Sequence, residues 1–178
     1  MKYRKYGRSY CFTWHKILLR GVRSFPKPAT NQNSCCLKQF FDTLPTAAFA
    51  LTNIDDKNGS FMLQNTKARK KTYALKTVAD FKSKIVEKQL SGTLITVAGT
   101  EVWTKLIGVF NMYNLTAIIA TAELLGLERL EVLTIVSQLE SVSGRFEYIV
   151  SNNGVTAIVD YAHTPDALKN VLETINDM

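Results

Sequence analysis

The sequence Val155-Thr-Ala-Ile-Val-Asp160-Tyr-Ala-His-Thr-Pro-Asp166 predicts one strand, a short loop and the start of a helix. The run from Val155 to Asp160 reads as a continuous apolar strand, which is typical of a strand buried in a parallel sheet. Thr164 suits the N-cap of the next helix, Pro165 its first position, and Asp166 its electropositive first turn. Apolar residues at helical spacing predict the buried face of that helix: Leu168, Val171, Leu172 and Ile175.

A strand, loop and helix in this order form the first unit of an open α/β sheet, in which ligands bind beyond the carboxyl ends of the strands. Asp160, Tyr161 and His163 fall at that edge. The helix start offers backbone N–H groups to an anion, and Asp160 is able to accept hydrogen bonds from ribose hydroxyls. The alternative is structural, because an Asp at a strand end often caps the next turn and a lone His is often only hydrogen-bonded. The residues alone leave both interpretations open.

The preceding segment predicts a mixture of strands and helices. Ala47–Thr52 indicates a buried strand, and Asp55–Gly59 a turn in which Asn-Gly supplies positive φ. Asn111 is a candidate N-cap for a buried helix that ends near Leu125, with Gly126 in the C′ position. Short β-rich runs indicate a small, mostly antiparallel sheet: Phe61–Leu63, Thr72–Leu75, Thr93–Val97 and Val102–Leu106. The remaining expected elements are a helix over roughly Leu127–Leu139, a strand over Phe146–Val150 and a turn at Asn152–Gly154.

The net charge of +7 is concentrated at one end of the sequence. Residues 1–41 hold nine Lys and Arg side chains and no Asp or Glu, whereas the rest of the chain holds 13 basic and 15 acidic side chains. A basic arm of this kind, with interleaved aromatic residues, is able to bind nucleic acid or anionic lipid. Most such arms are solvated and disordered, so we do not expect nucleic-acid binding to be the main function.

Cysteine usage and hydropathy indicate a cytoplasmic protein. Cys11, Cys35 and Cys36 form no Cys-x-x-Cys pair, and adjacent cysteines make poor disulfide partners, so we expect reduced thiols. With only His15 and His163 as further soft ligands, we assign no metal site. No apolar run approaches the length of a membrane-spanning helix.

Four motifs in order resemble the Mur ligase family, and within it the UDP-N-acetylmuramoyl-tripeptide synthetases. They are Ala48-Phe-Ala-Leu-x-Asn53-x-Asp-Asp56, Leu106-Ile-Gly-x-Phe-Asn111-x-Tyr-Asn114, Gly144-Arg-Phe-Glu147 and Asp160-Tyr-Ala-His-Thr-Pro-Asp-Ala-Leu168. The resemblance runs from about Leu37 to the end of the sequence. It implies an α/β fold: the C-terminal part of a central ATPase domain with a small β-rich insertion, and the first β-α unit of a Rossmann-like C-terminal domain. We expect an arm at residues 1–36, the partial central domain at 37–143 and the start of the C-terminal domain at 144–178.

The resemblance also implies roles for individual residues. Asn111 and Asn114 would face the adenine of ATP, Arg145 would reach the ribose and phosphates, and Asp160 would accept from the ribose hydroxyls. His163 would lie near the active cleft as a candidate catalytic residue. The implied reaction uses ATP and Mg²⁺ to activate a peptide carboxylate of UDP-MurNAc-L-Ala-D-Glu as an acyl phosphate. An incoming amine, expected to be meso-diaminopimelate with lysine as the alternative, then attacks it.

Some of the family's features are missing from this sequence. It holds no Gly-x-x-x-x-Gly-Lys-Ser/Thr loop to cradle phosphates. The position of the family's carbamylated, magnesium-binding lysine corresponds to Leu37, with Lys38 beside it. We therefore expect a fragment that is inactive alone and is monomeric or prone to aggregation. The other readings are a non-catalytic module that binds nucleotide or protein, and nucleic-acid binding through the basic arm.

Overall fold

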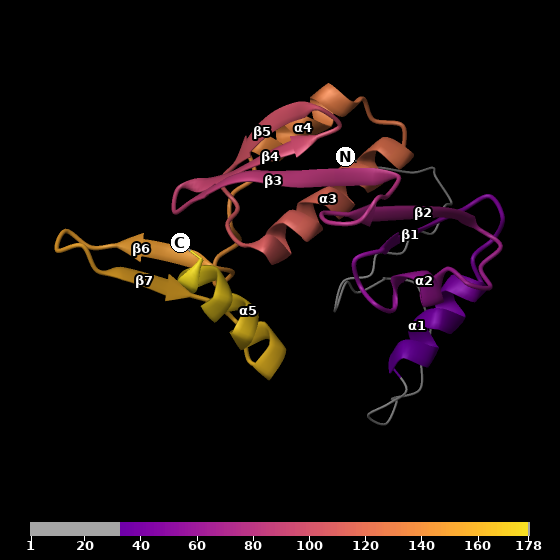
Figure 1. Ribbon diagram of the computed structural model, residues 1–178, viewed down its shortest axis with the longest axis horizontal. Coiled ribbons are helices and arrows are strands. Elements are labelled where there is room, and N and C mark those ends of the chain that lie inside the picture. Colours follow the sequence, from indigo (N-terminus) through magenta and orange to yellow (C-terminus); the bar gives the residue numbers. More distant parts are fainter. Residues whose placement is uncertain (1–32, 178) are drawn as a thin grey trace, which may run out of the picture. The chain divides into compact units, whose positions relative to one another are not determined.

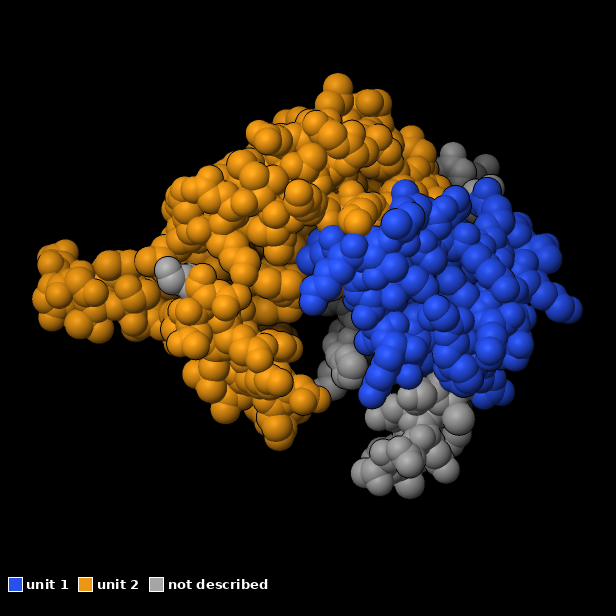
Figure 2. Space-filling model, in the orientation of Figure 1, with its two compact units in different colours: residues 1–80 blue, residues 81–178 orange. Residues whose placement is uncertain are grey.

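Two parallel strands form the sheet of the first of two units in this computed structural model, which describes residues 33–177 and their side chains from residue 37. Figure 2 colours the two units, residues 1–80 and 81–178. Strand β1 (Phe49–Asn53) pairs in register with β2 (Arg69–Ala74), so that Phe49 lies opposite Arg69. Helices α1 (Asn33–Asp42) and α2 (Gly59–Met62) belong to the same unit (Figure 1). Its apolar core comprises Phe41, Leu44, Ala48, Ala50, Met62, Leu63 and Ala68.

The expected strand over Phe61–Leu63 is wrong, because Phe61 and Met62 belong to the short helix α2 and Leu63 is its C-cap. Its first residue, Gly59, packs so tightly that a Cβ atom there would lie 2.0 Å from the carbonyl oxygen of Asn53. The Met62 amide donates to the Asn58 carbonyl at 3.0 Å, and the helix turns the Met62 side chain into the core. The expected strand over Thr72–Leu75 overlaps β2 at Thr72–Ala74, and this strand pairs in parallel with β1.

Asp55 links the loops that follow β1 and β2. Its carboxylate accepts hydrogen bonds from the backbone amides of Leu75, Lys76 and Thr77 at 2.8–2.9 Å. Partial burial pushes the pKa of the Asp55 carboxyl upward, but the bonds from the Thr77 side chain and these amides outweigh it and hold the pKa well below its usual value. The charged carboxylate therefore ties together the carboxyl ends of the two parallel strands.

Three antiparallel strands form the main sheet of the second unit. They are β3 (Phe81–Gln89), β4 (Gly92–Val97) and β5 (Thr100–Thr104), in which β4 pairs with both neighbours. Helices α3 (Val109–Leu124) and α4 (Arg129–Ser137) pack against this sheet (Figure 1). The Thr116 hydroxyl of α3 lies 2.9 Å from that of Ser83 on β3, inside the core. Strand β3 is absent from the sequence prediction, since its residues lack a clear alternation and it carries a bulge between Ile85 and Glu87.

The last part of the second unit is a hairpin followed by a helix. Strand β6 (Glu147–Val150) pairs with β7 (Thr156–Val159) through the expected turn at Asn152–Gly154, and α5 (Pro165–Asn176) follows. The prediction of a buried parallel strand at Val155–Asp160 is wrong for this chain. Strand β7 pairs antiparallel and is largely exposed, because among the described residues only β6 lies beside it. Of the predicted apolar face of α5, only Val171 is buried.

Several helix ends follow the sequence signals. The Thr164 hydroxyl caps α5 by accepting from the Ala167 amide at 3.3 Å, with Pro165 at the helix start. Gly126 has a φ of 92° directly after the C-cap of α3, and the Leu127 amide reaches back to the Ala122 carbonyl at 3.1 Å. These bonds form a Schellman turn and confirm the C′ assignment. The helix expected over Leu127–Leu139 spans the shorter range of α4.

Within the described residues, no helix is both long and apolar enough to cross a membrane. Most of the basic arm, including Cys11, lies outside the described residues. Of the expected arm at residues 1–36, the structure describes only the backbone of residues 33–36, which begin α1.

Candidate functional site

Two chain segments are joined by hydrogen bonds where β6 begins and β7 ends, and we call residues 144–146 and 160–162 the clasp. The Asp160 carboxylate accepts from the Phe146 amide at 2.8 Å and from the Ala162 amide at 2.7 Å. The Tyr161 amide donates to the Gly144 carbonyl at 2.9 Å. Asp160 is thus engaged by the backbone, as the structural interpretation expects. Each carboxylate oxygen has a second lone pair, so the group retains capacity to accept from a ligand.

Phe146 has a left-handed backbone with a φ of 49°, which is uncommon for a residue with a bulky side chain. Its amide is the one held by Asp160, and its ring is 2% exposed. The ring packs 6.1 Å from that of Phe110, within a cluster that also contains Ile107 and Val171. The conformation buries Phe146 inward, and it leaves the side chain of the preceding residue, Arg145, exposed to solvent.

Arg145, Tyr161 and His163 form a row of contacts on the exposed side of the clasp. The Arg145 guanidinium carbon lies 5.6 Å from the centroid of the Tyr161 ring. The His163 ring meets the same Tyr161 ring edge-on, with centroids 5.0 Å apart. His163 Nδ1 lies 2.9 Å from the Tyr161 carbonyl oxygen, which only accepts, so Nδ1 carries the hydrogen. In the neutral ring Nε2 is then an acceptor.

Asn111 and Asn114 lie one turn apart on α3 and are hydrogen-bonded to each other. Asn114 Nδ2 donates to Asn111 Oδ1 at 3.3 Å, and Asn111 Nδ2 donates to the Ile107 carbonyl at 2.7 Å. The prediction that Asn111 is the N-cap is wrong, because α3 begins at Val109 after Gly108, which has a φ of 94°. The bond to Ile107 instead fixes the Asn111 side chain. Asn111 thereby orients Asn114, whose amide has a second N–H and an oxygen to offer.

The aromatic pair Phe110–Phe146 connects the two groups of candidate residues. Phe110 precedes Asn111 on α3, and Phe146 follows Arg145 in the clasp. Their contact, together with the packing of Ala162 against the same cluster, makes one hydrophobic base for both groups. One aromatic contact therefore links the chain next to Asn111 with the chain next to Arg145, although these two residues are 34 positions apart in sequence.

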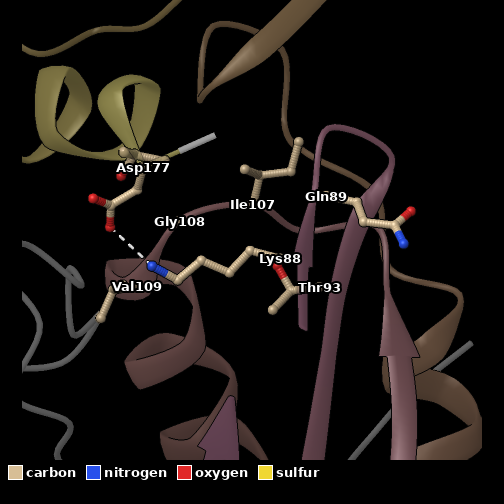
Figure 3. A pocket seen from close by; sticks show the side chains of 8 residues that line it. Lys88, Gln89, Thr93, Ile107, Gly108, Val109 and Asp177 are labelled. Carbon is tan, nitrogen blue, oxygen red and sulfur yellow. Dashed lines mark hydrogen bonds and ion pairs between the residues drawn. The ribbon is translucent and has the colours of Figure 1, made fainter. Parts of the chain in front are cut away.

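A small recess lies in the second unit at the start of α3, beside Ile107 (Figure 3). Lys88 Nζ and Asp177 Oδ2 form an ion pair at 2.8 Å across it, as the dashed line in Figure 3 shows. Its lining includes none of the five candidate residues, and it is smaller than most small-molecule sites. We therefore do not regard this recess as the functional site.

Leu37 and Lys38, which the resemblance aligns with the family's magnesium-binding lysine, lie in α1 of the first unit. Leu37 is 44% exposed, whereas Lys38 is buried, with its ammonium 2.7 Å from Asp42 Oδ1 and 5.5 Å from the Phe61 ring centroid. Lys38 thus has two partners of its own. Among the described residues, no three His, Cys, Asp or Glu side chains form a group able to hold a metal ion. We assign a Mg²⁺ ion to none of these residues.

Sequence models of two protein-family domains match the chain. The Mur ligase middle domain matches residues 36–122, and the glutamate ligase domain of Mur ligases matches residues 144–178. The candidate asparagines lie in the first match, and the whole clasp lies in the second.

Curated relatives carry the name UDP-N-acetylmuramoyl-L-alanyl-D-glutamate--2,6-diaminopimelate ligase. The protein from Parabacteroides distasonis is 57% identical over 141 residues, and that from Cytophaga hutchinsonii is 53% identical over 141 residues. Each match covers 79% of this chain and 29% of the relative. The chain therefore spans less than a third of the length of these relatives.

Two solved structures also resemble this chain in fold. A structure of a ligase with that name covers 87% of this chain, with 28% identity and a TM-score of 0.66. MurF from Acinetobacter baumannii covers 79%, with 16% identity and a TM-score of 0.71, and this likeness concerns the fold alone. The chain covers 34% and 32% of these two structures.

Proposed function

Because this chain belongs to the Mur ligase family, we propose that it supplies the adenosine side of the ATP site in a ligase that adds meso-diaminopimelate to UDP-MurNAc-L-Ala-D-Glu. The names of the curated relatives support this substrate pair. The proposed setting is the cytoplasm.

The asparagine pair supports recognition of adenine. A carboxamide matches the adenine edge, since its oxygen accepts from the exocyclic N6 amine while its N–H donates to a ring nitrogen. Asn114 is the residue proposed to make this contact, and Asn111 orients it through the 3.3 Å bond. The bond from Asn111 to the Ile107 carbonyl fixes the direction of the pair before any ligand arrives. A preoriented pair loses less conformational entropy on binding.

The clasp supports recognition of the sugar and phosphates. Arg145 is exposed and carries a planar fork of N–H donors that pairs well with phosphate oxygens. Asp160 has acceptor capacity left for ribose hydroxyls beside its two backbone bonds. His163 presents Nε2 as an acceptor near the same place. The observation that carries the proposal is the Phe110–Phe146 contact, because it ties the adenine-side and ribose-side residues to one base.

The proposed reaction of the whole ligase has two steps. A peptide carboxylate oxygen attacks the γ-phosphorus of ATP, forming an acyl phosphate and releasing ADP. The amine of the incoming amino acid then attacks the acyl carbon, forms the amide and releases phosphate and a proton. Mg²⁺ supplies charge neutralisation for the phosphates in such a transfer. The phosphate-cradling loop is not in this sequence, so the residues of this chain bind and orient the nucleoside, and we expect no turnover from it alone.

Nucleotide titration of the ¹⁵N-labelled chain tests the proposal. We expect ATP and adenosine to shift the side-chain amide signals of Asn111 and Asn114, with weak affinity because the phosphate loop is missing. GTP is the matched control, since its base presents O6 where adenine presents an amine. Asn114→Ala should abolish the preference for adenine. Equal shifts with ATP and GTP, or shifts confined to residues far from α3 and the clasp, would contradict the proposal.

A catalytic assay with ATP, Mg²⁺, UDP-MurNAc-dipeptide and diaminopimelate tests the second half of the proposal. Turnover by the purified chain would show that the residues present suffice for phosphate transfer and would overturn the assignment of a nucleoside-binding role alone.

A further inference from the structure

We propose that Tyr161 is a positioning residue that holds the Arg145 guanidinium in its binding orientation. The meaning of this orientation for nucleotide binding rests on the proposed function. The geometry of the contact itself is independent of any ligand.

The backbone fixes the Tyr161 ring relative to Arg145. The Tyr161 amide is bonded to the Gly144 carbonyl, one residue before Arg145, at 2.9 Å. On the other side, Asp160 accepts from the Phe146 amide, one residue after Arg145, at 2.8 Å. The two bonds flank Arg145 on one segment of the clasp and come from the adjacent residues Asp160 and Tyr161 on the other. The backbone positions of Arg145 and Tyr161 are therefore fixed relative to each other.

The Tyr161 ring is the partner that the structure provides for the Arg145 charge. None of the ion pairs among the described residues 37–177 includes Arg145, although its side chain is exposed. An exposed arginine has many rotamers, and ordering it on binding costs free energy. A cation–π contact with a ring restricts the rotamers in advance, and it uses no N–H donor, so the N–H groups stay available for oxygen acceptors.

His163 makes a second contact with the Tyr161 ring. The His163 ring lies edge-on to Tyr161, and its Nδ1 is tied to the Tyr161 carbonyl. The Tyr161 ring is thereby flanked by Arg145 and by His163, although the residue is 66% exposed. A largely exposed tyrosine with two aligned neighbours is better explained by orienting them than by burial of its own apolar area.

The Arg145 side-chain signals test the geometry without nucleotide. Protons over an aromatic ring are shifted upfield, so we expect an upfield Arg145 Nε–H signal in the native chain. Tyr161→Phe should retain the shift, because the ring remains, and Tyr161→Leu should abolish it. Phe61→Leu is the matched control, since it removes an exposed aromatic ring beside a different cation, Lys38. An unchanged Arg145 shift in Tyr161→Leu would overturn the proposal.

Nucleotide titration of the same variants tests the consequence. A cation–π contact at an exposed site contributes about 0.5–1 kcal/mol, so Tyr161→Leu should weaken ATP binding by about two- to fivefold. Tyr161→Phe should bind as the native chain does, and Tyr161→Leu in an Arg145→Ala background should have no further effect. Weakened binding by Tyr161→Phe, or a full effect of Tyr161→Leu without Arg145, would overturn the positioning role.

The two experiments separate the inference from the proposed function. A native chain that binds no ATP while Arg145 shows the ring-dependent shift would refute the proposed function and support the Tyr161–Arg145 contact. A native chain that binds ATP with no ring-dependent shift would support the function and refute the contact.

Discussion

Replacing Asp160 by Asn should destabilise the second unit, because the clasp depends on a carboxylate with two acceptor oxygens. In the native chain one oxygen accepts from the Phe146 amide at 2.8 Å and the other from the Ala162 amide at 2.7 Å. An Asn keeps one acceptor and turns an NH₂ group toward the other amide. Two N–H groups then face each other, and one backbone donor loses its partner.

The expected loss follows from these two bonds. A hydrogen bond to a charged group contributes about 1.5–3 kcal/mol, and a neutral one about 0.5–1.5 kcal/mol. Asp160 is half-buried, so water partly replaces the lost bond, and the lower part of the range applies. We expect Asp160→Asn to lower the free energy of unfolding by about 2 kcal/mol. With an m value of about 1.5 kcal/mol/M, the urea midpoint should fall by roughly 1 M.

Tryptophan fluorescence during urea unfolding measures this change. Trp103 lies on β5 in the second unit, and a Trp14→Phe background leaves it as the reporter. Glu101→Gln, which neutralises an exposed acid on the same strand, is the control and should shift the midpoint little. Faster hydrogen exchange at the Phe146 and Ala162 amides should accompany the loss. A midpoint for Asp160→Asn equal to that of the control would refute the argument that these bonds hold the clasp.

Three further predictions concern the framework around the site. The pKa of Asp55 is lowered on folding from 3.8, so its stabilising contribution is fully present above that pH and is lost as the pH falls below it; Asp55→Asn should flatten acid unfolding followed by circular dichroism. Lys88→Gln should remove the exposed pair with Asp177 and cost less than about 1 kcal/mol in urea unfolding, a difference that salt should erase. Gly92→Ala should destabilise β4 by at least about 2 kcal/mol in thermal unfolding, because its φ is +151° and a Cβ would lie 2.2 Å from the Thr104 carbonyl oxygen; an unaltered melting temperature would contradict this.

Signals that depend on a few neighbouring residues were readable from the sequence. The Thr164 cap with Pro165 and the Gly126 turn were predicted, because each is stabilised within one helical turn. Helix α3 nevertheless starts before the predicted cap at Asn111. Gly108 adopts a φ of 94° there, and the Asn111 side chain bonds to Ile107 instead.

Properties that depend on distant neighbours were not readable in the same way. The apolar run at Val155–Asp160 predicted a strand, but its burial depends on what lies beside it, and β7 is largely exposed. The resemblance placed Arg145 and Asp160 at one site. It did not pair Arg145 with Tyr161, since residues 16 positions apart show no periodic pattern and the contact lies next to an unusual left-handed backbone at Phe146.

The short sequence separation within the clasp bears on the order in which this part of the chain assembles. Asp160 and Phe146 are 14 residues apart, and the β6–β7 hairpin lies between them. Closing a loop of about ten residues takes on the order of 10–100 ns, and loop-closure entropy rises only slowly with length. The clasp therefore needs no segment made after Ala162. During synthesis it is able to close before α5 emerges, so that Val171 of the helix packs against a Phe146 ring whose backbone the clasp already holds.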